Sequence, residues 1–540
     1  MICRVNCIMF EELPTTRVFW AGVVAFRLWN ALFVRTSFNP DEYWQSTEVA
    51  HHLVFGYGYL TWEWQSDAQL RGFAHPALFA GLYKLLELLN LDSRWAVAYG
   101  PRLLQGLVAA ANDFFLYKLA RNYFDAKAAK WALLCQLFSW FTFYVMVRPF
   151  SNCVETLCTT AALTYWPWEF LDGASKKKDE AVSTKRSNRT LALMLAALGV
   201  LFRPTNAIIW LYPGVVHFLQ TQDRVRLIFG VVMPIAIVTI VTMLCIDRLG
   251  YGEWTFVPYN FFKFNVMEGK DKLYGEHPWS WYFSQGYPAI VGTTLPIVIA
   301  GYLTVPPSKK DLGRVIMWAI FVYSNAAHKE FRFVLPLLPP AFVYAGYCLR
   351  NLEQKLYVQF RERTQWNLLR LAAFSVIVPN MLSAYYLSRS HQRAPVEVMD
   401  YLADCIQENP DTSIHFWTPC HATPYYSYLH QNVSMWFPDC SPANRERTEG
   451  CESHQLERNP RHFLSKLYRL SSLDGDVSDA SSMELPNFVV TYSTIAAKIR
   501  PLLADTQYVE AASFLHSDVS GDADSSEVVS KMLVYKRVMQ

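Results

Sequence analysis

Residues 18–46 read VFWAGVVAFRLWNALFVRTSFNPDEYWQS, an apolar run followed at once by a turn and two acidic residues. The run from Val18 to Val34 carries one charged residue, Arg27. A helix that crosses a bilayer needs about 20 mostly apolar residues, or about 17 at the short end. The stretch therefore predicts a membrane-spanning helix, with Asp41 and Glu42 just beyond its end.

The same pattern recurs along the chain. Stretches with almost no charge cover residues 103–117, 131–147, 153–171, 191–201, 206–219, 227–246, 287–305, 315–327, 333–349 and 368–387. We therefore expect a mainly α, polytopic membrane protein with about eleven transmembrane helices, some of them completed by their flanks. A large soluble protein with buried helices is the alternative, and the basic residues clustered between alternate runs argue against it. The short run 75–89 contains Lys84 and Glu87, so it is predicted to be embedded or interfacial and not to cross.

The composition excludes several other classes. Of the 540 residues, 52% are hydrophobic and only 18% are charged, compared with about 25% charged in soluble proteins. Aromatic residues reach 15% and the net charge is only +3. These values exclude a disordered chain, a collagen-like fibre and a basic protein that binds nucleic acid.

The distribution of lysine and arginine among the loops predicts how the chain is oriented in the membrane. They are more frequent in one set of loops than in the loops that alternate with it. The basic set is 121–130, 172–189, 220–226, 306–314 and 350–370, and the other set is 35–74, 148–152, 203–205, 247–286 and 328–332. Basic loops are usually cytosolic, so the N-terminus is predicted to be cytosolic. We predict a transmembrane module over 1–388, a non-cytosolic domain over 389–540, and no cleavable signal peptide.

The polar C-terminal part contains Cys405, Cys420, Cys440 and Cys451. On a non-cytosolic face these cysteines permit two disulfides in any of three pairings. Asn432 begins a glycosylation sequon on the same side. A second sequon at Asn188 lies in a loop predicted to be cytosolic, so it should stay unmodified.

Asp41 and Glu42 have two interpretations. Pro40 can start a helix that carries both acids in its first turn, where they would only stabilise the helix terminus. Ionisable groups beside a membrane are, however, often functional. Residues 43–55 combine apolar, aromatic and histidine side chains, which predicts an amphipathic helix lying at the membrane interface.

A second candidate region is His328-Lys329-Glu330-Phe331-Arg332-Phe333, between two predicted spans. Its cations can snorkel or pair with Glu330. On a non-cytosolic face they would also suit a lipid phosphate. The aromatic stretch 274–282, which contains His277, is typical of an interfacial belt. Arg148 and Arg203 each stand at the predicted end of a span.

No metal site is predicted. Residues 474–476 and 522–524 have Asp-x-Asp spacing, but they lie in loop-like sequence without an adjoining strand pattern. His51, His52 and His421 have no Cys or His partners at metal-site spacing. Neither common glycine-rich phosphate loop is present.

Together these motifs resemble the dolichol-phosphate-mannose-dependent mannosyltransferases of the GT-C fold, glycosyltransferase family 22. Asn39-Pro40-Asp41-Glu42 is similar to the first-loop motif of that family, and residues 328–333 to its His-Lys-Glu-x-Arg-Phe motif. Residues 41–46, 58–64 and 419–427 are similar to the branch that adds the third, α-1,2-linked mannose to the glycosylphosphatidylinositol (GPI) precursor. Asn39 stands where many members have His, so no role of that His is carried over.

The resemblance implies a β-linked mannosyl phosphate donor and an α-linked product, which a single inverting displacement can connect. Asp41 is the candidate base, and Glu42 would orient it or hold the acceptor sugar. His328, Lys329 and Arg332 would offset the second negative charge on the departing lipid phosphate. Further candidates for the substrate site are Glu330, His277 and Arg203. No metal or other cofactor is expected, because side chains can manage a single phosphate.

The resemblance also implies the partners and the compartment. The expected partners are the lipid-linked donor, the GPI glycolipid acceptor and membrane lipids, without nucleic acid; a monomer would suffice. The expected location is the endoplasmic reticulum membrane, with a luminal C-terminal domain. A family member acting on the dolichol-linked N-glycan precursor, a lipid or sugar transporter, and a non-catalytic subunit remain as alternatives.

Overall fold

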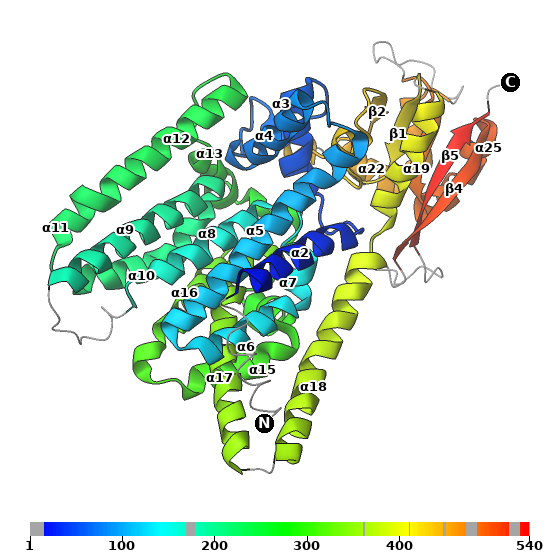
Figure 1. Cartoon of the computed structure of the whole chain (residues 1–540). Helices are drawn as coiled ribbons and strands as arrows, with labels where there is room; N and C mark the ends of the chain where they lie inside the picture. Colours follow the sequence, from blue (N-terminus) through cyan, green and yellow to red (C-terminus); the bar gives the residue numbers. More distant parts are fainter. Residues whose placement is uncertain are drawn as a thin grey trace. The chain divides into compact units, whose positions relative to one another are not determined.

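The computed structural model describes residues 16–168, 179–359, 362–409, 411–445, 450–470, 483–517 and 530–538. Within them the chain is mainly helical (Figure 1) and forms two compact units, each assembled from separate stretches. The helical unit combines the described residues up to Phe33 with Glu63–Leu78 and Pro101–Tyr385. The mixed unit combines Val34–Trp62, Phe79–Gly100 and the described residues from Tyr386 onward. The region around Asp41 thus folds with the C-terminal residues.

Helices account for nearly all of the regular structure in the helical unit; α4, α5 and α18 each contain residues of both units. The elements are α2 (Arg17–Phe33), α4 (Ala74–Leu88), α5 (Arg94–Tyr123), α6 (Ala126–Leu137), α7 (Trp140–Val145), α8 (Ser151–Tyr165), α9 (Asp179–Phe202), η5 (Pro204–Asn206), α10 (Ala207–Gln220), α11 (Arg224–Leu227), η6 (Ile228–Val232), α12 (Met233–Tyr251), α13 (Val257–Phe262), η7 (Lys263–Met267), η8 (Lys270–Tyr274), η9 (Tyr282–Gly286), α14 (Tyr287–Val291), η10 (Gly292–Thr294), α15 (Leu295–Thr304), η11 (Pro307–Lys309), α16 (Asp311–Tyr323), η12 (Phe331–Leu337), α17 (Leu338–Gln359) and α18 (Glu362–Arg389). Figure 1 shows α8, α9 and α10 side by side.

Local sequence explains where several of these helices begin, end and pack. The side chain of Asp125 caps α6 by accepting a hydrogen bond from Ala128 N at 2.9 Å, as N-cap aspartates do. Gly252 ends α12 with a left-handed φ of 78°. Gly346 lets α17 approach α6 closely, because a Cβ there would lie 2.2 Å from the carbonyl oxygen of Ala128.

Three helices among the described residues are long and apolar enough to cross a membrane by length and composition. They are Arg224–Tyr251, Tyr282–Thr304 and Phe331–Leu356. Other predicted spans coincide with helices that are shorter or that carry polar groups, such as α8 with its buried Glu155. The number of about eleven spans therefore stays a prediction.

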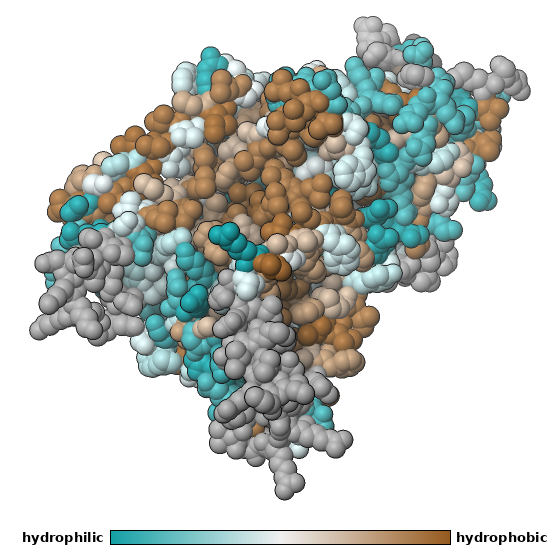
Figure 2. Space-filling model, in the orientation of Figure 1, coloured by the Kyte–Doolittle hydropathy of each residue, from teal (hydrophilic) through white to brown (hydrophobic). Residues whose placement is uncertain are grey.

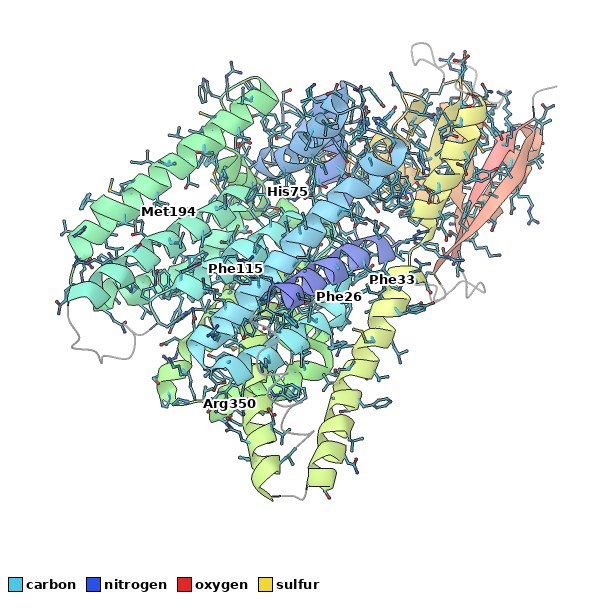
Figure 3. The ribbon with its side chains drawn as sticks, in the orientation of Figure 1. Phe26, Phe33, His75, Phe115, Met194 and Arg350 are labelled. Atoms are coloured by element: carbon cyan, nitrogen blue, oxygen red, sulfur yellow. A yellow bond between two sulfur atoms is a disulfide. The ribbon has the colours of Figure 1, made fainter. Side chains whose placement is uncertain are left out.

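The apolar surface of the helical unit is extensive. In α12, the side chains of Ile237, Val238 and Val241 are 50–65% exposed. Figure 2 shows apolar residues gathered over the helices on the visible face, and Met194, labelled in Figure 3, is 53% exposed on α9. Exposed apolar area on this scale is typical of a surface that contacts lipid.

A buried ion pair ties α2 to α5 inside the helical unit. Arg27 Nε lies 2.7 Å from Asp113 Oδ2, and both side chains are fully buried. Gln136 donates to the same carboxylate, and Arg27 Nη1 donates to Asn30. Since breaking a buried pair leaves an uncompensated charge, this contact fixes the position of α2. Phe26 and Phe33, also on α2 (Figure 3), pack against Phe143.

The mixed unit is built around a five-stranded sheet of order β2-β1-β3-β5-β4. β1 pairs in parallel with β2 and β3, whereas β5 is antiparallel to β3 and β4. The elements are η2 (Tyr43–Thr47), α3 (Glu48–Phe55), η3 (Trp62–Trp64), α19 (Ala394–Glu408), β1 (Ser413–Trp417), α20 (Tyr426–Leu429), β2 (Ser434–Trp436), α21 (Pro442–Arg445), α22 (Glu452–Arg458), α23 (Pro460–Leu467), β3 (Phe488–Tyr492), α24 (Ser493–Lys498), α25 (Arg500–Asp505), β4 (Tyr508–Ser517) and β5 (Ser530–Arg537), with η3 shared between the units.

One disulfide forms among the four C-terminal cysteines, not two. It joins Cys420 to Cys440. Cys405 lies on α19 and packs at the edge of the sheet core, and Cys451 is buried next to His454. Both of these behave as apolar core residues, the usual role of a buried free cysteine. Asn432 is exposed just before β2, as a glycosylation acceptor must be, and its modification stays a prediction.

Candidate active site

The loop that contains Asp41 turns sharply into a helix. Asn39 Oδ1 accepts a hydrogen bond from Asp41 N at 3.0 Å, and the Asn39 carbonyl accepts one from Glu42 N at 3.1 Å. The helix begins at Asp41 and passes through the π-helical turn η2 into α3. Single π turns inside α-helices are frequent at functional sites. The local geometry also explains Asn39, which serves as a helix-capping residue.

The structure separates the two acids of this turn. Glu42 is fully buried, and its Oε1 accepts a hydrogen bond from Phe38 N at 3.2 Å, so it closes the turn that precedes the helix. Asp41 is only half-buried. Of the two interpretations of the pair, helix-terminus stabilisation describes Glu42, whereas Asp41 is the acid with access to solvent. Its role as a base stays a prediction.

Further along this helix, Trp44 and Glu48 form hydrogen bonds to other residues of the mixed unit. Trp44 Nε1 donates to the carbonyl of Thr423 at 3.1 Å, and Trp44 itself is 2% exposed. Glu48 accepts from the backbone N–H groups of Tyr425 and Ser427 at 2.7 and 3.2 Å. Protein therefore covers the face of this helix that carries Trp44 and Glu48, whereas Leu53 is 43% exposed. The position of residues 43–55 at a membrane interface stays a prediction.

A histidine pair completes this face. His51 Nε2 lies 3.1 Å from His430 Nδ1, and His51 is fully buried. Burial lowers the pKa of His51 to about 3, and it also lowers the pKa of His430. Sequence spacing could not identify His430 as a partner, since the two residues lie far apart along the chain.

The second candidate region folds as a tight turn before η12 in the helical unit. Glu330 accepts two hydrogen bonds from Arg332, at 2.5 Å from Nε and 2.9 Å from Nη2. His328 Nε2 lies 3.0 Å from the same carboxylate. Burial by itself raises the pKa of Glu330. The charge of Arg332 and these hydrogen bonds have the larger, opposite effect, so the pKa lies well below its usual range. Burial lowers the pKa of His328, and Glu330 outweighs this effect, so the net shift is upward.

Two residues outside the motif hold the backbone of this turn. The hydroxyl of Tyr282 donates to the Glu330 carbonyl at 3.0 Å and accepts from Glu330 N at 3.2 Å. Asp271 Oδ2 accepts from the backbone N–H groups of Ala327 and His328 at 3.0 and 3.3 Å. Asp271 and Tyr282 were not predicted, because only the folded chain brings them to the turn.

Lys329 and His277 meet at the same turn. Lys329 is 3% exposed, and its Nζ donates to the carbonyls of His277, at 2.9 Å, and Ala326. The imidazole of His277 is exposed and stacks on Trp281 with a centroid distance of 4.5 Å. In this conformation the lysine charge stabilises the turn, and its use by a phosphate remains a prediction.

Arg203 joins this group through an aromatic ring. Its guanidinium lies 5.0 Å from the centre of the Phe333 ring, and that of Arg332 lies 5.5 Å from the same centre. Arg203 Nε also lies 3.3 Å from Glu155 Oε2, and Glu155 is fully buried. Glu155 was overlooked because residues 153–171 count as a nearly charge-free run. The structure therefore brings His328, Glu330, Arg332 and Arg203 together in the helical unit, whereas Asp41 and Glu42 belong to the mixed unit.

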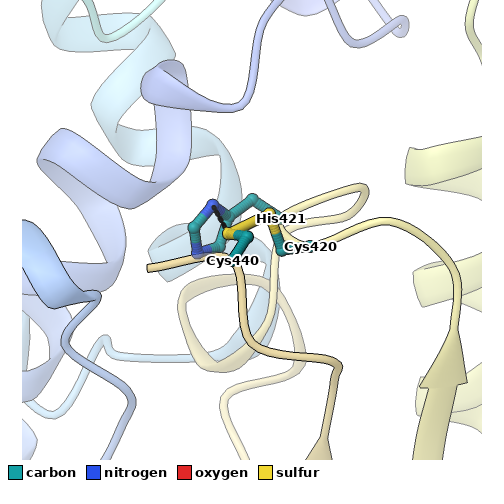
Figure 4. A group of neighbouring side chains, drawn as sticks. All are labelled: Cys420, His421 and Cys440. Atoms are coloured by element: carbon teal, nitrogen blue, oxygen red, sulfur yellow. Dashed lines mark hydrogen bonds between the residues drawn. A yellow bond between two sulfur atoms is a disulfide. The ribbon is translucent and has the colours of Figure 1, made fainter. Parts of the chain in front are cut away.

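One cluster among the described residues has the composition of a metal site, namely Cys420, His421 and Cys440 (Figure 4). The sequence offers His421 no Cys or His partners at metal-site spacing, and the fold brings Cys440 next to Cys420 and His421. Both sulfurs are joined in the disulfide, however, so neither is a thiolate that could bind an ion. The Asp-x-Asp sequences at 474–476 and 522–524 lie outside the described residues.

Comparison with known proteins gives consistent matches over most of the chain. A model of the Alg9-like mannosyltransferase family matches residues 18–430. Mannosyltransferase APTG1 of Arabidopsis thaliana is 39% identical over 95% of this chain and 90% of its own length. GPI alpha-1,2-mannosyltransferase 3 of Homo sapiens is 37% identical over 96% of this chain and 86% of its own length.

Solved structures match the fold at low identity. ArnT from Cupriavidus metallidurans, bound to undecaprenyl phosphate, has a TM-score of 0.58 at 12% identity and covers 96% of this chain and 97% of its own. The apo oligosaccharyltransferase of Archaeoglobus fulgidus has a TM-score of 0.51 at 11% identity and covers 93% of this chain and 74% of its own. The predicted GT-C fold is thereby confirmed.

Proposed function

The chain belongs to the Alg9-like mannosyltransferase family, as its motifs predicted, and we propose that it transfers an α-1,2-linked mannose to a GPI precursor. The donor is dolichyl-phosphate-mannose, and the mannose is the third of the glycan. The observation that carries this proposal is the name GPI alpha-1,2-mannosyltransferase 3, shared by relatives that match nearly the whole chain.

The reaction is a single inverting displacement. Asp41 removes the proton from the acceptor hydroxyl, whose oxygen attacks the anomeric carbon of the β-linked donor. The bond to the phosphate oxygen breaks, and dolichyl phosphate leaves with a second negative charge. A positioned base contributes about 10²–10⁴-fold to such a step. The half-buried position of Asp41 at a helix start, with its backbone held by Asn39, supports this role.

The leaving phosphate is stabilised by the cations of the turn at 328–332 and by Arg203. Both arginines already pair with carboxylates, Arg332 with Glu330 and Arg203 with Glu155. A phosphate that binds here therefore either shares each guanidinium with its carboxylate or replaces that carboxylate. Guanidinium groups suit this exchange because their planar fork donates hydrogen bonds to two oxygens at once. Glu42 and His277 act by holding the loops in place.

The location follows from the substrates. We place the enzyme in the endoplasmic reticulum membrane as a multi-pass protein with a cytosolic N-terminus and a luminal mixed unit. The basic loops favour this orientation, and the Cys420–Cys440 disulfide fits an oxidising compartment. The donor, the acceptor and membrane lipids are the partners, the chain acts as a monomer, and no metal takes part.

The test is a transfer assay with the purified chain in detergent, dolichyl-phosphate-mannose and a two-mannose GPI acceptor, in the presence of EDTA. Wild type and Asp41→Asn are compared after both are shown to be monodisperse. Transfer by wild type only would support the reaction, its metal independence and the base.

Three other results would revise the proposal. Full activity of Asp41→Asn would exclude Asp41 as the base. Transfer only to an N-glycan precursor would keep the mechanism and replace the acceptor. Transfer to neither acceptor would favour a transporter or a non-catalytic subunit.

A further inference from the structure

The helix that begins at Asp41 contains a third acid, Glu48, which is fully buried in the mixed unit. Its Oε1 accepts hydrogen bonds from Tyr425 N at 2.7 Å, Ser427 Oγ at 2.6 Å and Ser427 N at 3.2 Å. Within the described part of the chain, the hydrogen-bond donors to Glu48 all belong to residues 425–427, and none of them is a cation. A carboxylate buried without a cation is costly, and burial raises the pKa of Glu48.

Glu48 is part of a continuous line of contacts along one helix face. Trp44 Nε1 donates to the Thr423 carbonyl, and Thr47 Oγ1 lies 3.1 Å from Ser427 Oγ. His51 meets His430 one turn further on. Residues spaced three and four apart share a helix face, so every turn of the helix after Asp41 is bonded to segment 420–440.

That segment is itself closed into a loop. The Cys420–Cys440 disulfide joins its two ends. The rings of His421 and Phe437, next to these ends, pack on Trp44 at centroid distances of 4.9 and 5.4 Å. Trp44 lies one helical turn after Asp41. The direction of the helix axis, and with it the position of the Asp41 carboxylate, is therefore set by contacts with this loop.

We propose that Glu48 is a positioning residue, which anchors the Asp41 helix to the disulfide-closed segment 420–440 and so holds the Asp41 carboxylate in its reactive place. The proposal rests on the proposed function in that Asp41 is taken as the base. A misplacement of about 1 Å can cost about 10²-fold in rate. Glu48 acts through the helix and does not touch substrate.

The test compares Glu48→Ala and Glu48→Gln in the full-length chain. Alanine removes every acceptor, whereas glutamine keeps one oxygen for the backbone N–H groups. We expect kcat to fall about 10–100-fold in Glu48→Ala, with the KM for donor changed by less than about threefold. Glu48→Gln should recover kcat to within about fivefold of wild type.

Tyr468→Phe is the matched control for a purely structural role. It removes two hydrogen bonds in the same unit, at 2.6 Å to His415 and 3.0 Å to Trp417, and leaves the Asp41 helix untouched. It should lower the thermal midpoint by about 2–8 °C without changing kcat per folded molecule. If Glu48→Ala is too unstable to purify, Ser427→Ala is the substitute. It removes one of the three hydrogen bonds to Glu48 Oε1 and the contact with Thr47, and should lower kcat about 3–10-fold.

Hydrogen exchange at the amides of residues 41–47 gives a readout that needs no turnover. Faster exchange in Glu48→Ala than in wild type, with no change in Tyr468→Phe, supports anchoring even if wild type fails to use the GPI acceptor. Unchanged exchange or wild-type kcat in Glu48→Ala would overturn the proposal. Equal loss of activity in Glu48→Ala and Glu48→Gln would also overturn it, because the charge would then act in the reaction itself.

Discussion

The helix that begins at Asp41 and the turn at 328–332 are each held by a carboxylate, fully buried for Glu48 and half-buried for Glu330, but the partners lie at very different distances along the chain. Glu330 bonds to Arg332 and His328, each two residues away in the chain. Glu48 bonds to Tyr425 and Ser427, which are 377 and 379 residues away. The ion pairs of the turn at 328–332, the cationic turn, are thus formed within the turn, although Tyr282 and Asp271 hold its backbone from a distance. The helix that begins at Asp41, by contrast, depends on the C-terminal residues for the partners of its buried carboxylate. This contrast predicts that variants of the two regions will fail in different ways.

The largest loss of stability is expected for Glu330→Ala. It leaves Arg332 and His328 without their shared carboxylate, at a cost of about 3–4 kcal/mol. The thermal midpoint of the purified protein in detergent measures this loss. Glu276→Ala is the control, because it breaks an exposed pair with Lys272 and should cost at most about 1 kcal/mol. Similar shifts in the two variants would show that the turn does not depend on Glu330.

The second prediction concerns the Cys420–Cys440 disulfide, which closes the segment that packs against the helix beginning at Asp41. Cys420→Ser opens a loop with a sequence separation of 20 residues, which should lower the free energy of unfolding by about 2–3 kcal/mol. Activity should fall as well, because the opened segment carries the anchors of the Asp41 helix. Cys451→Ser, at a buried cysteine that is not bridged, should change activity far less. Comparable activity of Cys420→Ser and Cys451→Ser would show that the disulfide does not support the active site.

The third prediction tests whether Glu42 is the structural acid and Asp41 the reactive acid. Glu42→Ala removes the acceptor for Phe38 N and should cost about 1 kcal/mol of stability. Asp41→Asn should leave stability nearly unchanged and lower transfer far more than Glu42→Ala does. Measuring thermal midpoint and initial rate on both variants tests the assignment. The reverse order of the two rates would identify Glu42 as the reactive acid.

The smallest effect is a pH dependence of the cationic turn. The pKa of His328 is raised in the folded chain, so its contribution to stability is fully present below the ordinary pKa of 6.5 and is lost as the pH rises through the raised value. The pKa of Glu330 is lowered, so its contribution is present above 4.5 and is lost only in strong acid. Thermal midpoints between about pH 6 and pH 8.5 should therefore fall more in wild type than in His328→Gln. Parallel curves would contradict this assignment.

The helical architecture was predictable because apolar runs and basic loops repeat along the chain. The sheet was not predicted, although β3 reads FVVTY and β5 contains MLVY, which are typical of strands buried in a sheet. Such short apolar segments cannot be told from buried helix by periodicity alone. Strand pairing between β1 and β3 joins residues more than 70 positions apart, as in Ile414 and Phe488, and local pattern carries no information about it.

The candidate site shows the same division. Asp41, His328 and Arg332 were identified because they stand in short motifs whose spacing is local. Glu48, Glu155, Asp271 and Tyr282 were missed because each acts on a residue that only the folded chain brings near. Cys420 and Cys440 were found as cysteines, but their pairing remained open, since spacing does not select one of three pairings.

The sequence by itself determined the class of protein, the family and the residues that carry charge into an apolar surrounding, because hydropathy and motif spacing are properties of neighbouring residues. Only the tertiary structure decided how those residues are held. It joined the Asp41 helix to the C-terminal residues, brought Tyr282 and Asp271 to the turn at 328–332, and selected one of the possible disulfide pairings. Buried polar groups must find partners wherever the fold brings donors and acceptors together, and that proximity does not exist until the chain has folded.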